Sequence, residues 1–418
     1  MSQKSELVPK RRFKEFENAG DWEQRELGDF VIKAVDNRGK TPPTQEFGRY
    51  PLLEVASLGK ASPDYTKVTK YVDEETYNGW FRAYIKKDDI LFSTVGNTGL
   101  VTLMDGYAGA TIAQNIVGFR AIEGNNPQFL VQMFQLPENL KRAKRIEMGA
   151  VQPSIKVSQL IHVSYLLPNS EQEQEKIGSF FKHLDDTITL HQRKLDKLNN
   201  IKQSYLYQMF PQNGEKVPSL RFSEFSEEWK SNRMGELGKT YTGLNGKTKD
   251  DFGHGKAKFV TYMNVYKNTI SNPNLVEEVE LDSRQNEVKY GDVLFTTSSE
   301  TPEEVGLSSV WLNNSENVYL NSFCFGYRLS INIDSYYLAY MLRSQSIRKK
   351  IILLAQGISR YNISKSKMMD IEIVFPKLEE QKKIGQFFKQ LDETIDIQEQ
   401  ELEKLKNLKK AYLNEMFV

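Results

Sequence analysis

The segments of this sequence that most resemble catalytic or phosphate-binding motifs lack the required spacing. Residues 243–248 (GLNGKT) mimic the end of a phosphate-binding loop, but two residues separate the glycines where four are needed, and Tyr241 stands where a glycine is required. Residues 41–44 (TPPT) are not the Asn/Asp-Pro-Pro-aromatic tetrapeptide of a DNA methyltransferase. No Gly-x-Ser-x-Gly elbow occurs. We therefore expect no catalytic residues in this chain.

The residues that could bind a metal ion are too dispersed to form a site. One cysteine, Cys324, cannot build a structural zinc site. Asp282, Glu287 and Lys289 faintly resemble a metal-dependent nuclease site, but such fragments are common in charged sequences. The four histidines are scattered along the chain: His162, His183, His191 and His254. We expect no bound metal.

Two loops rich in hydroxyl and amide groups follow predicted strands. Residues 93–99 (STVGNTG) lie at the end of the strand predicted at 89–94. Residues 296–301 (TTSSET) lie at the end of the strand predicted at 288–297. Such groups suit phosphate or base-edge contacts, and they suit ordinary β-turns equally well. The candidate nucleic-acid contacts in these loops are Thr94, Asn97, Thr98, Thr297, Ser298 and Ser299.

Basic and amide side chains recur at two further pairs of matched positions. Turns near residues 36–41 and 245–249 give the candidates Arg38, Lys40, Thr41, Asn245, Lys247 and Lys249, although a solvated loop has the same composition. Residues 152–156 (QPSIK) and 360–365 (RYNISK) precede the final strand of each half, where their side chains could reach a groove of DNA. They give the candidates Gln152, Lys156, Arg360, Tyr361 and Lys365.

Short strands and helices must position these loops. Runs typical of strands also occur at residues 116–122 and 323–329, and helical patterns occur at 129–140 and 335–354. This mixture predicts two α+β globular regions, which we name the first head (within residues 1–168) and the second head (within residues 212–376).

The chain repeats itself. Residues 173–198 and 380–405 match at 15 of 26 positions without gaps, at an offset of 207 (380 − 173). A weaker repeat, the lead, carries Val8-Pro9 and Trp22 in the first copy and Val217-Pro218 and Trp229 in the second. The strand motif Asp-aliphatic-Leu-Phe recurs at residues 89–92 and 292–295, while the rest of the heads differ. The two copies have kept a scaffold and diverged in their heads.

Each repeat ends in a long helix with a heptad seam. The seam consists of Ile177, Phe181, Leu184, Ile188, Leu195 in the first copy and Ile384, Phe388, Leu391, Ile395, Leu402 in the second. Both seams become polar at matched positions, His191 with Gln398 and Lys202 with Lys409. About 35 residues give a rod of roughly 50 Å. We expect the rods to pack antiparallel, with the heads at opposite ends about a pseudo-twofold axis and the N-terminal lead near the end of the second helix; a homodimeric coiled coil is the alternative.

Composition limits the class of protein. The chain has 418 residues, 39% of them hydrophobic, so it can bury two or three cores. It lacks a long apolar run, a signal-peptide pattern and a second cysteine, which predicts a cytoplasmic protein. The net charge is +1, low for a DNA-binding protein, so any DNA surface must be segregated or shared with partners.

These features divide the chain into four segments. We predict an N-terminal lead and first head at 1–168, a central helix at 169–211, a linker and second head at 212–376, and a C-terminal helix at 377–418. The predicted fold class is α+β, with two globular domains separated by two long antiparallel coiled-coil helices and related by a pseudo-twofold internal repeat.

The duplicated blocks resemble a known family. Glu-Gln-x-Lys-Ile-Gly-x-Phe-Phe…Leu-Asp-x-Thr-Ile begins at Glu173 and again at Glu380, and Pro168 and Pro376 precede the helices. With the leads and strand motifs, this pattern is similar to the specificity subunit of type I restriction–modification systems over essentially the whole chain.

The resemblance implies two target-recognition domains that each read half of a bipartite double-stranded DNA site, with the helices setting the gap. It implies no catalysis by this chain, two methyltransferase subunits that bind S-adenosylmethionine, and two translocase–nuclease subunits. Three alternatives stay open: a coiled-coil adaptor with protein-binding heads, a stand-alone nuclease or methyltransferase, and a specificity subunit in a system without its nuclease.

Overall fold

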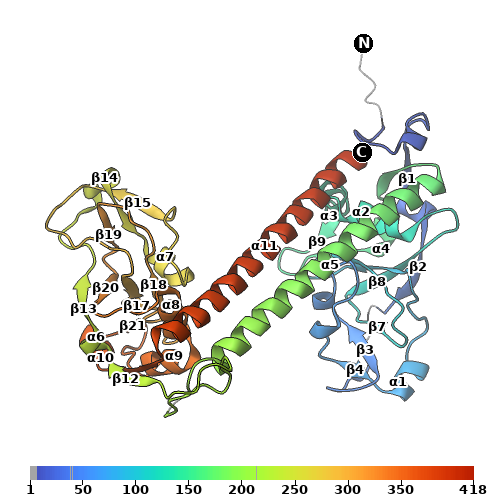
Figure 1. Ribbon diagram of the computed structural model, residues 1–418. Helices are drawn as coiled ribbons and strands as arrows, with labels where there is room; N and C mark the ends of the chain where they lie inside the picture. Colours follow the sequence, from blue (N-terminus) through green and yellow to red (C-terminus); the bar gives the residue numbers. More distant parts are fainter. Residues whose placement is uncertain (1–6, 38, 40, 213) are drawn as a thin grey trace. The chain divides into compact units, whose positions relative to one another are not determined.

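The computed structural model describes residues 7–37, 39, 41–212 and 214–418, and it divides into two compact units. Unit 1 comprises Met1–Arg193 with Gln400–Val418, and unit 2 comprises Lys194–Glu399. The division falls inside two long helices, α5 (Glu171–Gln208) and α11 (Leu378–Met416) (Figure 1). Each unit therefore holds one head with part of each long helix.

Unit 1 is built from short strands and helices before α5. Its strands are β1 (Glu23–Glu26), β2 (Val31–Asp36), β3 (Tyr50–Leu53), β4 (Tyr71–Val72), β5 (Ile90–Ser93), β6 (Val101–Leu103), β7 (Thr111–Ile112), β8 (Ile116–Ala121), β9 (Glu147–Met148), β10 (Ser154–Ile155) and β11 (Ser164–Leu167). Its shorter α-helices are α1 (Glu74–Gly79), α2 (Pro127–Gln135), α3 (Pro137–Lys144) and α4 (Val157–Leu160).

Unit 2 follows a similar order between α5 and α11. Its strands are β12 (Lys230–Arg233), β13 (Gly238–Thr242), β14 (Phe252–Val260), β15 (Val276–Val279), β16 (Val293–Thr296), β17 (Ser298–Ser299), β18 (Ser308–Val310), β19 (Val318–Leu320), β20 (Cys324–Leu329), β21 (Tyr361–Asn362) and β22 (Glu372–Phe375). Its shorter α-helices are α6 (Met234–Leu237), α7 (Tyr262–Lys267), α8 (Ser335–Arg343), α9 (Gln345–Ile352) and α10 (Lys365–Met369).

The two heads share one topology although their sequences hardly align. An antiparallel four-stranded sheet has the order β2-β8-β5-β6 in unit 1 and β13-β20-β16-β18 in unit 2. A three-stranded sheet has the order β4-β3-β7 in the first head and β15-β14-β19 in the second, and the last pair is parallel in both. Each lead also pairs with the strand before the long helix, β1 with β11 and β12 with β22. The internal repeat therefore extends through the divergent heads.

The structure corrects three predicted elements. The helical stretch 129–140 is two helices, because Pro137 disfavours helical backbone at Leu136 and starts α3. The stretch 335–354 is likewise α8 and α9, separated at Ser344, whose backbone is extended. The strand predicted at 288–297 begins only at Val293, because Gly291 has a φ of +84° and forms a turn.

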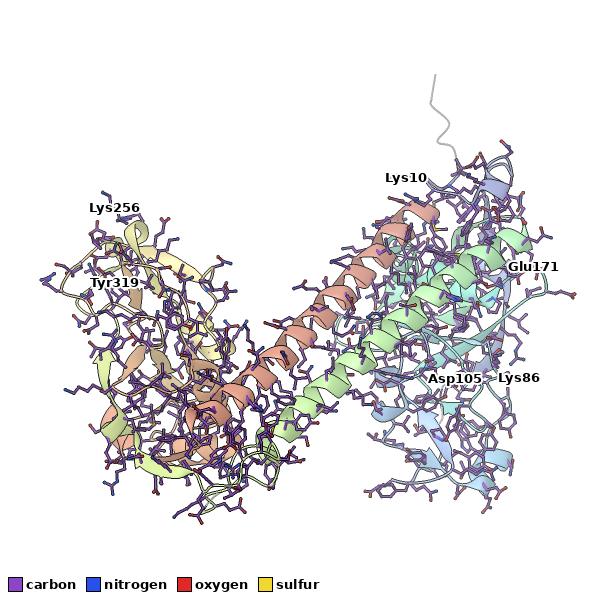
Figure 2. All side chains as sticks on the ribbon, in the orientation of Figure 1. Lys10, Lys86, Asp105, Glu171, Lys256 and Tyr319 are labelled. Atoms are coloured by element: carbon purple, nitrogen blue, oxygen red, sulfur yellow. The ribbon has the colours of Figure 1, made fainter. Side chains whose placement is uncertain are left out.

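Each lead packs its tryptophan into the core of its own unit. Trp22 lies edge-on to Phe417 near the end of α11, with ring centroids 5.9 Å apart, and the Arg11 backbone N–H donates to the Glu415 carbonyl at 2.8 Å. Figure 2 shows Lys10 of the lead beside this end of α11. In unit 2 the Leu220 N–H donates to the Gln208 carbonyl of α5 at 2.9 Å. The N-terminal lead therefore contacts the end of the second helix, as predicted.

The long helices pack antiparallel within each unit. In unit 1, Phe180 contacts Tyr412 with centroids 5.1 Å apart, and the Lys409 ammonium lies 2.7 Å from the Asp185 carboxylate. In unit 2, Lys202 lies 2.5 Å from Asp392. Since 392 − 185 and 409 − 202 both equal 207, the two ion pairs are equivalent. Each polar seam lysine thus faces an aspartate of the other helix.

The predicted seam residues differ in burial. Leu184, Ile188 and Leu391 are half-buried beside the polar pairs. The others are buried: Ile177, Phe181, Leu195, Ile384, Phe388, Ile395 and Leu402. Of the polar positions, Gln398 is buried, and His191 lies 3.7 Å from Glu401 in unit 1.

Candidate nucleic-acid interface

In the first head, the loop after the central strand β5 is joined to the segment before the long helix. Val95 forms an antiparallel bridge with Ser154, and the Ile155 N–H donates to the Thr94 carbonyl at 2.8 Å. The β9–β10 hairpin presents residues 149–153 at its tip. The structure therefore brings the two polar segments of this head together.

The second head repeats this junction. Strand β17 follows the central strand β16 and pairs with β21, placing Ser298 opposite Asn362 and Ser299 opposite Tyr361. The Ile363 N–H donates to the Thr297 carbonyl at 3.0 Å, the counterpart of the bond between Ile155 and Thr94. Both heads thus carry the same pair of joined segments.

Most hydroxyl candidates in these loops hold the loops together. Thr94 is buried and donates to the Asn115 carbonyl at 3.2 Å, and buried Thr98 donates to the Glu147 carboxylate at 2.6 Å. Ser299 donates to Glu304 at 3.0 Å, and the hydrogen bonds from Tyr266 and from Ser299 lower the pKa of that carboxyl group. Ser298 is buried and Thr297 half-buried.

The exposed candidates lie mainly in the hairpin segments. Tyr361 and Lys365 are half-buried. The exposed members are Asn97, Gln152, Lys156 and Arg360. The surface offered to a ligand is therefore formed by the hairpin segments and Asn97 more than by the buried hydroxyl groups.

The basic turns near residues 36–41 and 245–249 lie elsewhere in the heads. Arg38 and Lys40 fall outside the described residues, and Thr41 is exposed. The Asn245 N–H donates to Gln285 at 3.1 Å, and exposed Lys249 lies in a 3-10 helix at Lys249–Asp251.

Lys247 is engaged in a local ion network. Its ammonium lies 3.4 Å from Asp251 and 3.5 Å from Asp282, and only 10% of its side chain is exposed. The Asp282 carboxylate also contacts Arg284, whose hydrogen bonds and charge lower the pKa of Asp282. Two carboxylates around one lysine weaken its attraction for a phosphate.

Sequence reasoning missed two buried aspartates that position the central strands. Asp89 precedes β5, is fully buried, and pairs with Arg120 of β8 at 2.7 Å. Asp292 precedes β16 and pairs with Arg328 of β20 at 2.6 Å. Both carboxylates also accept a backbone N–H from the preceding turn. The repeated Asp-aliphatic-Leu-Phe motif was the available signal.

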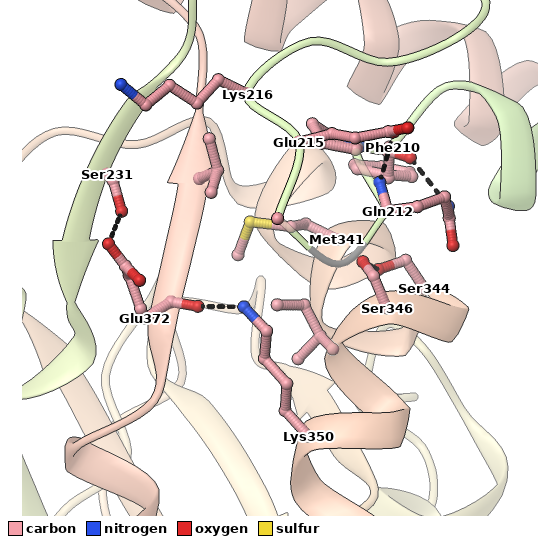
Figure 3. Close-up of a pocket in the computed structure, with 14 residues that line it drawn as sticks. Phe210, Gln212, Glu215, Lys216, Ser231, Met341, Ser344, Ser346, Lys350 and Glu372 are labelled. Atoms are coloured by element: carbon pink, nitrogen blue, oxygen red, sulfur yellow. Dashed lines mark hydrogen bonds between the residues drawn. The ribbon is translucent and has the colours of Figure 1, made fainter.

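The pocket in Figure 3 is a structural junction of unit 2 rather than a ligand site. Ser231 donates to the Glu372 carboxylate, and the Lys350 ammonium donates to the Glu372 carbonyl at 2.7 Å. These two bonds join β12 and α9 to β22. Within the described part of the chain no cluster of three metal-ligating side chains occurs. No described helix has the length and hydrophobicity needed to cross a membrane.

The fold and the paired loop junctions define a duplicated α+β protein whose two heads present equivalent polar hairpin segments. The family model for the type I restriction modification DNA specificity domain matches residues 19–200 and again 226–407. The chain therefore belongs to the family of type I restriction–modification DNA specificity subunits, and it carries the domain twice.

Two relatives and one solved structure are similar to this chain. The chain is 25% identical to a putative type I restriction enzyme MjaX specificity subunit of Methanocaldococcus jannaschii, over 94% of this chain and 92% of the relative. It is 24% identical to the MjaVIII specificity subunit of the same organism, over 94% and 91%. A crystal structure of the S subunit from M. genitalium has the same fold, with a TM-score of 0.62 at 14% identity and 99% of each chain covered.

Proposed function

We propose that each head binds one half of a bipartite double-stranded DNA target, so that this chain selects the sequence on which a type I complex acts. The observation that carries the proposal is the matched loop junction: two equivalent heads of one DNA specificity chain present the same joined segments. The two heads share a topology but differ in sequence. Such heads suit the recognition of two different short DNA sequences at a fixed separation.

The long helices, in this proposal, set the gap between half-sites and dock two methyltransferase subunits. Leu190 of α5 is 63% exposed and Ile397 of α11 is 58% exposed. They occupy equivalent positions, since 397 − 190 is 207. An exposed apolar side chain at each repeated position suits two identical partners, one per repeat. Two translocase–nuclease subunits complete the proposed complex.

Catalysis belongs to the partners in this proposal. S-adenosylmethionine is held by the methyltransferase subunits, and this chain contributes sequence selection in the cytoplasm. The polar groups of both junctions support this role, because the hydroxyl groups of Thr94, Thr98 and Ser299 are hydrogen-bonded to other groups of their own head and hold the loops in place.

Methylation mapping tests the proposal. The chain is co-expressed with its cognate methyltransferase subunit, and methylated bases are located across the host genome. A split motif of two short half-sites with a fixed gap, absent when this chain is omitted, is the expected result. No new methylation by a demonstrably active methyltransferase would favour the adaptor, whereas methylation or cleavage by the purified chain alone would show a stand-alone enzyme. Adding the nuclease subunit separates a restriction system from a modification-only one.

A further inference from the structure

The turn that closes the β9–β10 hairpin has a counterpart in the second head. Gly149 has a φ of +91° and Gly357 a φ of +143°, a region that favours glycine. A Cβ on Gly149 would lie 2.7 Å from the Gln152 carbonyl oxygen, and one on Gly357 would lie 2.0 Å from that of Arg360. Since 357 − 149 and 360 − 152 both equal 208, Gln152 and Arg360 occupy the same place in equivalent turns.

The pairing below each turn confirms this register. Met148 pairs with Ser154 in the first head, and Gln356 pairs with Asn362 in the second. Both differences, 356 − 148 and 362 − 154, are again 208. The turns are anchored to the loops after the central strands by the bonds already described, so each tip has a defined position on its head.

Both tips expose an aliphatic side chain almost completely. Val151 is 99% exposed and Ile358 is 97% exposed. One such residue is ordinary on a protein surface, but its occurrence in both equivalent turns argues for a ligand that covers it. DNA offers an apolar partner in its major groove, the methyl group of thymine.

The polar side chains beside these tips are available for recognition. Gln152 is exposed, and its side chain makes no hydrogen bond to another described residue. Arg360 is exposed, and its guanidinium carbon lies 5.7 Å from the centre of the Phe323 ring, which is itself 56% exposed. The ring lies against the guanidinium group, whose N–H donors make no hydrogen bond to another described residue.

Basic residues near both turns suit contacts to the DNA backbone. Lys144 and Arg145 are exposed just before the first hairpin, and Lys349 is exposed in α9 before the second turn. Phosphate contacts of this kind fix the orientation of a protein on DNA, whereas side chains at base edges determine sequence.

We propose that Gln152 and Arg360 are the equivalent base-reading residues of the two heads. A glutamine amide pairs with N6 and N7 of adenine, and a guanidinium group pairs with O6 and N7 of guanine. The half-site of the first head then contains an A·T pair where that of the second contains G·C. This inference rests on the proposed function, in which each head binds one half-site.

Reciprocal substitutions test the assignment. Gln152→Arg and Arg360→Gln are made separately in the full chain and co-expressed with the methyltransferase subunit, and methylated motifs are mapped. The first variant is expected to change one A·T position to G·C in one half-site, and the second to make the reverse change in the other. The original base is expected to lose preference by tenfold or more. Gln24→Arg, an exposed substitution on β1, is the matched control and should leave both half-sites unchanged.

The outcomes separate this inference from the proposed function. A wild-type split motif that both variants retain unchanged would overturn the assignment of Gln152 and Arg360 while leaving the function intact. A change in both half-sites from one variant would overturn it as well. If a variant complex no longer methylates DNA, the purified complex is used to select duplexes from a random-sequence pool. A selected base that shifts as predicted supports the assignment, and an unshifted base contradicts it.

Discussion

At the scale of single residues, two buried aspartates organise the heads. Asp292 accepts hydrogen bonds from Arg328, from the Lys289 backbone and from the Tyr241 hydroxyl group at 2.7 Å. Burial and the charge of Asp292 raise the pKa of Tyr241, so its hydroxyl stays protonated and donating at neutral pH. Asp89 plays the same part with Arg120. These contacts fix the start of each central strand, from which the polar loops extend.

Removing either carboxylate is expected to destabilise its own unit. Asp89→Ala leaves Arg120 without its partner and removes the acceptor of a turn N–H. Breaking a buried ion pair is strongly destabilising, but Arg120 is 34% exposed and water can solvate it, so we expect a loss of about 2 kcal/mol in the free energy of unfolding. Urea unfolding of the purified chain measures this loss.

Lys141→Ala, which removes a largely exposed pair with Glu138, serves as the control and should change stability by less than about 0.5 kcal/mol. Equal effects of the two substitutions would contradict the anchoring role.

At the scale of elements, ion pairs between the long helices explain the polar seam positions. Lys409 and Asp185 are 16% and 11% exposed, and Lys202 and Asp392 are 20% and 26% exposed. Each pair joins α5 to α11 inside one unit. A lysine in a heptad seam lowers stability but fixes register when a partner lies opposite. Each of the two equivalent ion pairs therefore specifies the antiparallel register of α5 and α11.

A double-mutant cycle tests the inter-helix pair of unit 1. Asp185→Asn and Lys409→Met are made singly and together, and unfolding free energies are compared. We expect a coupling energy of about 1–2 kcal/mol, because both groups are largely buried. The same cycle on Lys182 and Asp186, an exposed pair within α5, should give less than about 0.5 kcal/mol. A coupling no larger than this control would show that the pair does not specify register.

The elements that could be predicted from the sequence are those marked by a local, periodic pattern of residue types. The helices α5 and α11 and the α+β character of the heads follow from such patterns. The partner of Lys202 could not be predicted, because Asp392 is distant in sequence and lies beside the heptad core. The roles of Thr94 and Thr98 were also inaccessible, since burial depends on the pairing of β5 with β8 and on the hairpin that covers the loop. Composition alone does not distinguish a hydroxyl that holds a loop from one that binds a ligand.

At the scale of the whole molecule, the repeat unit and the compact unit are different divisions of the chain. Each repeat runs from a lead through a head to one long helix, whereas each compact unit combines a head with parts of both helices. Unit 1 therefore includes the last residues of the second repeat, among them Phe417, whose ring contacts Trp22. We therefore expect the folding of the two repeats to be interdependent, while the surface of each head can diverge.

The proposed role of the helices as a ruler predicts the effect of lengthening both. Seven residues continuing the heptad are inserted between Arg193 and Lys194 and also between Glu399 and Gln400, where the compact units divide, so that both inter-helix ion pairs are kept. Seven residues add about 10.5 Å to a helix, and base pairs of DNA rise about 3.4 Å, so we expect a gap longer by about three base pairs with both half-sites unchanged. Methylation mapping of the co-expressed complex measures the gap.

Replacing seven exposed helix residues without changing the length of the helices is the control, and it should keep the original gap. A lengthened chain that folds and methylates DNA at the original spacing would show that the helices do not set the gap.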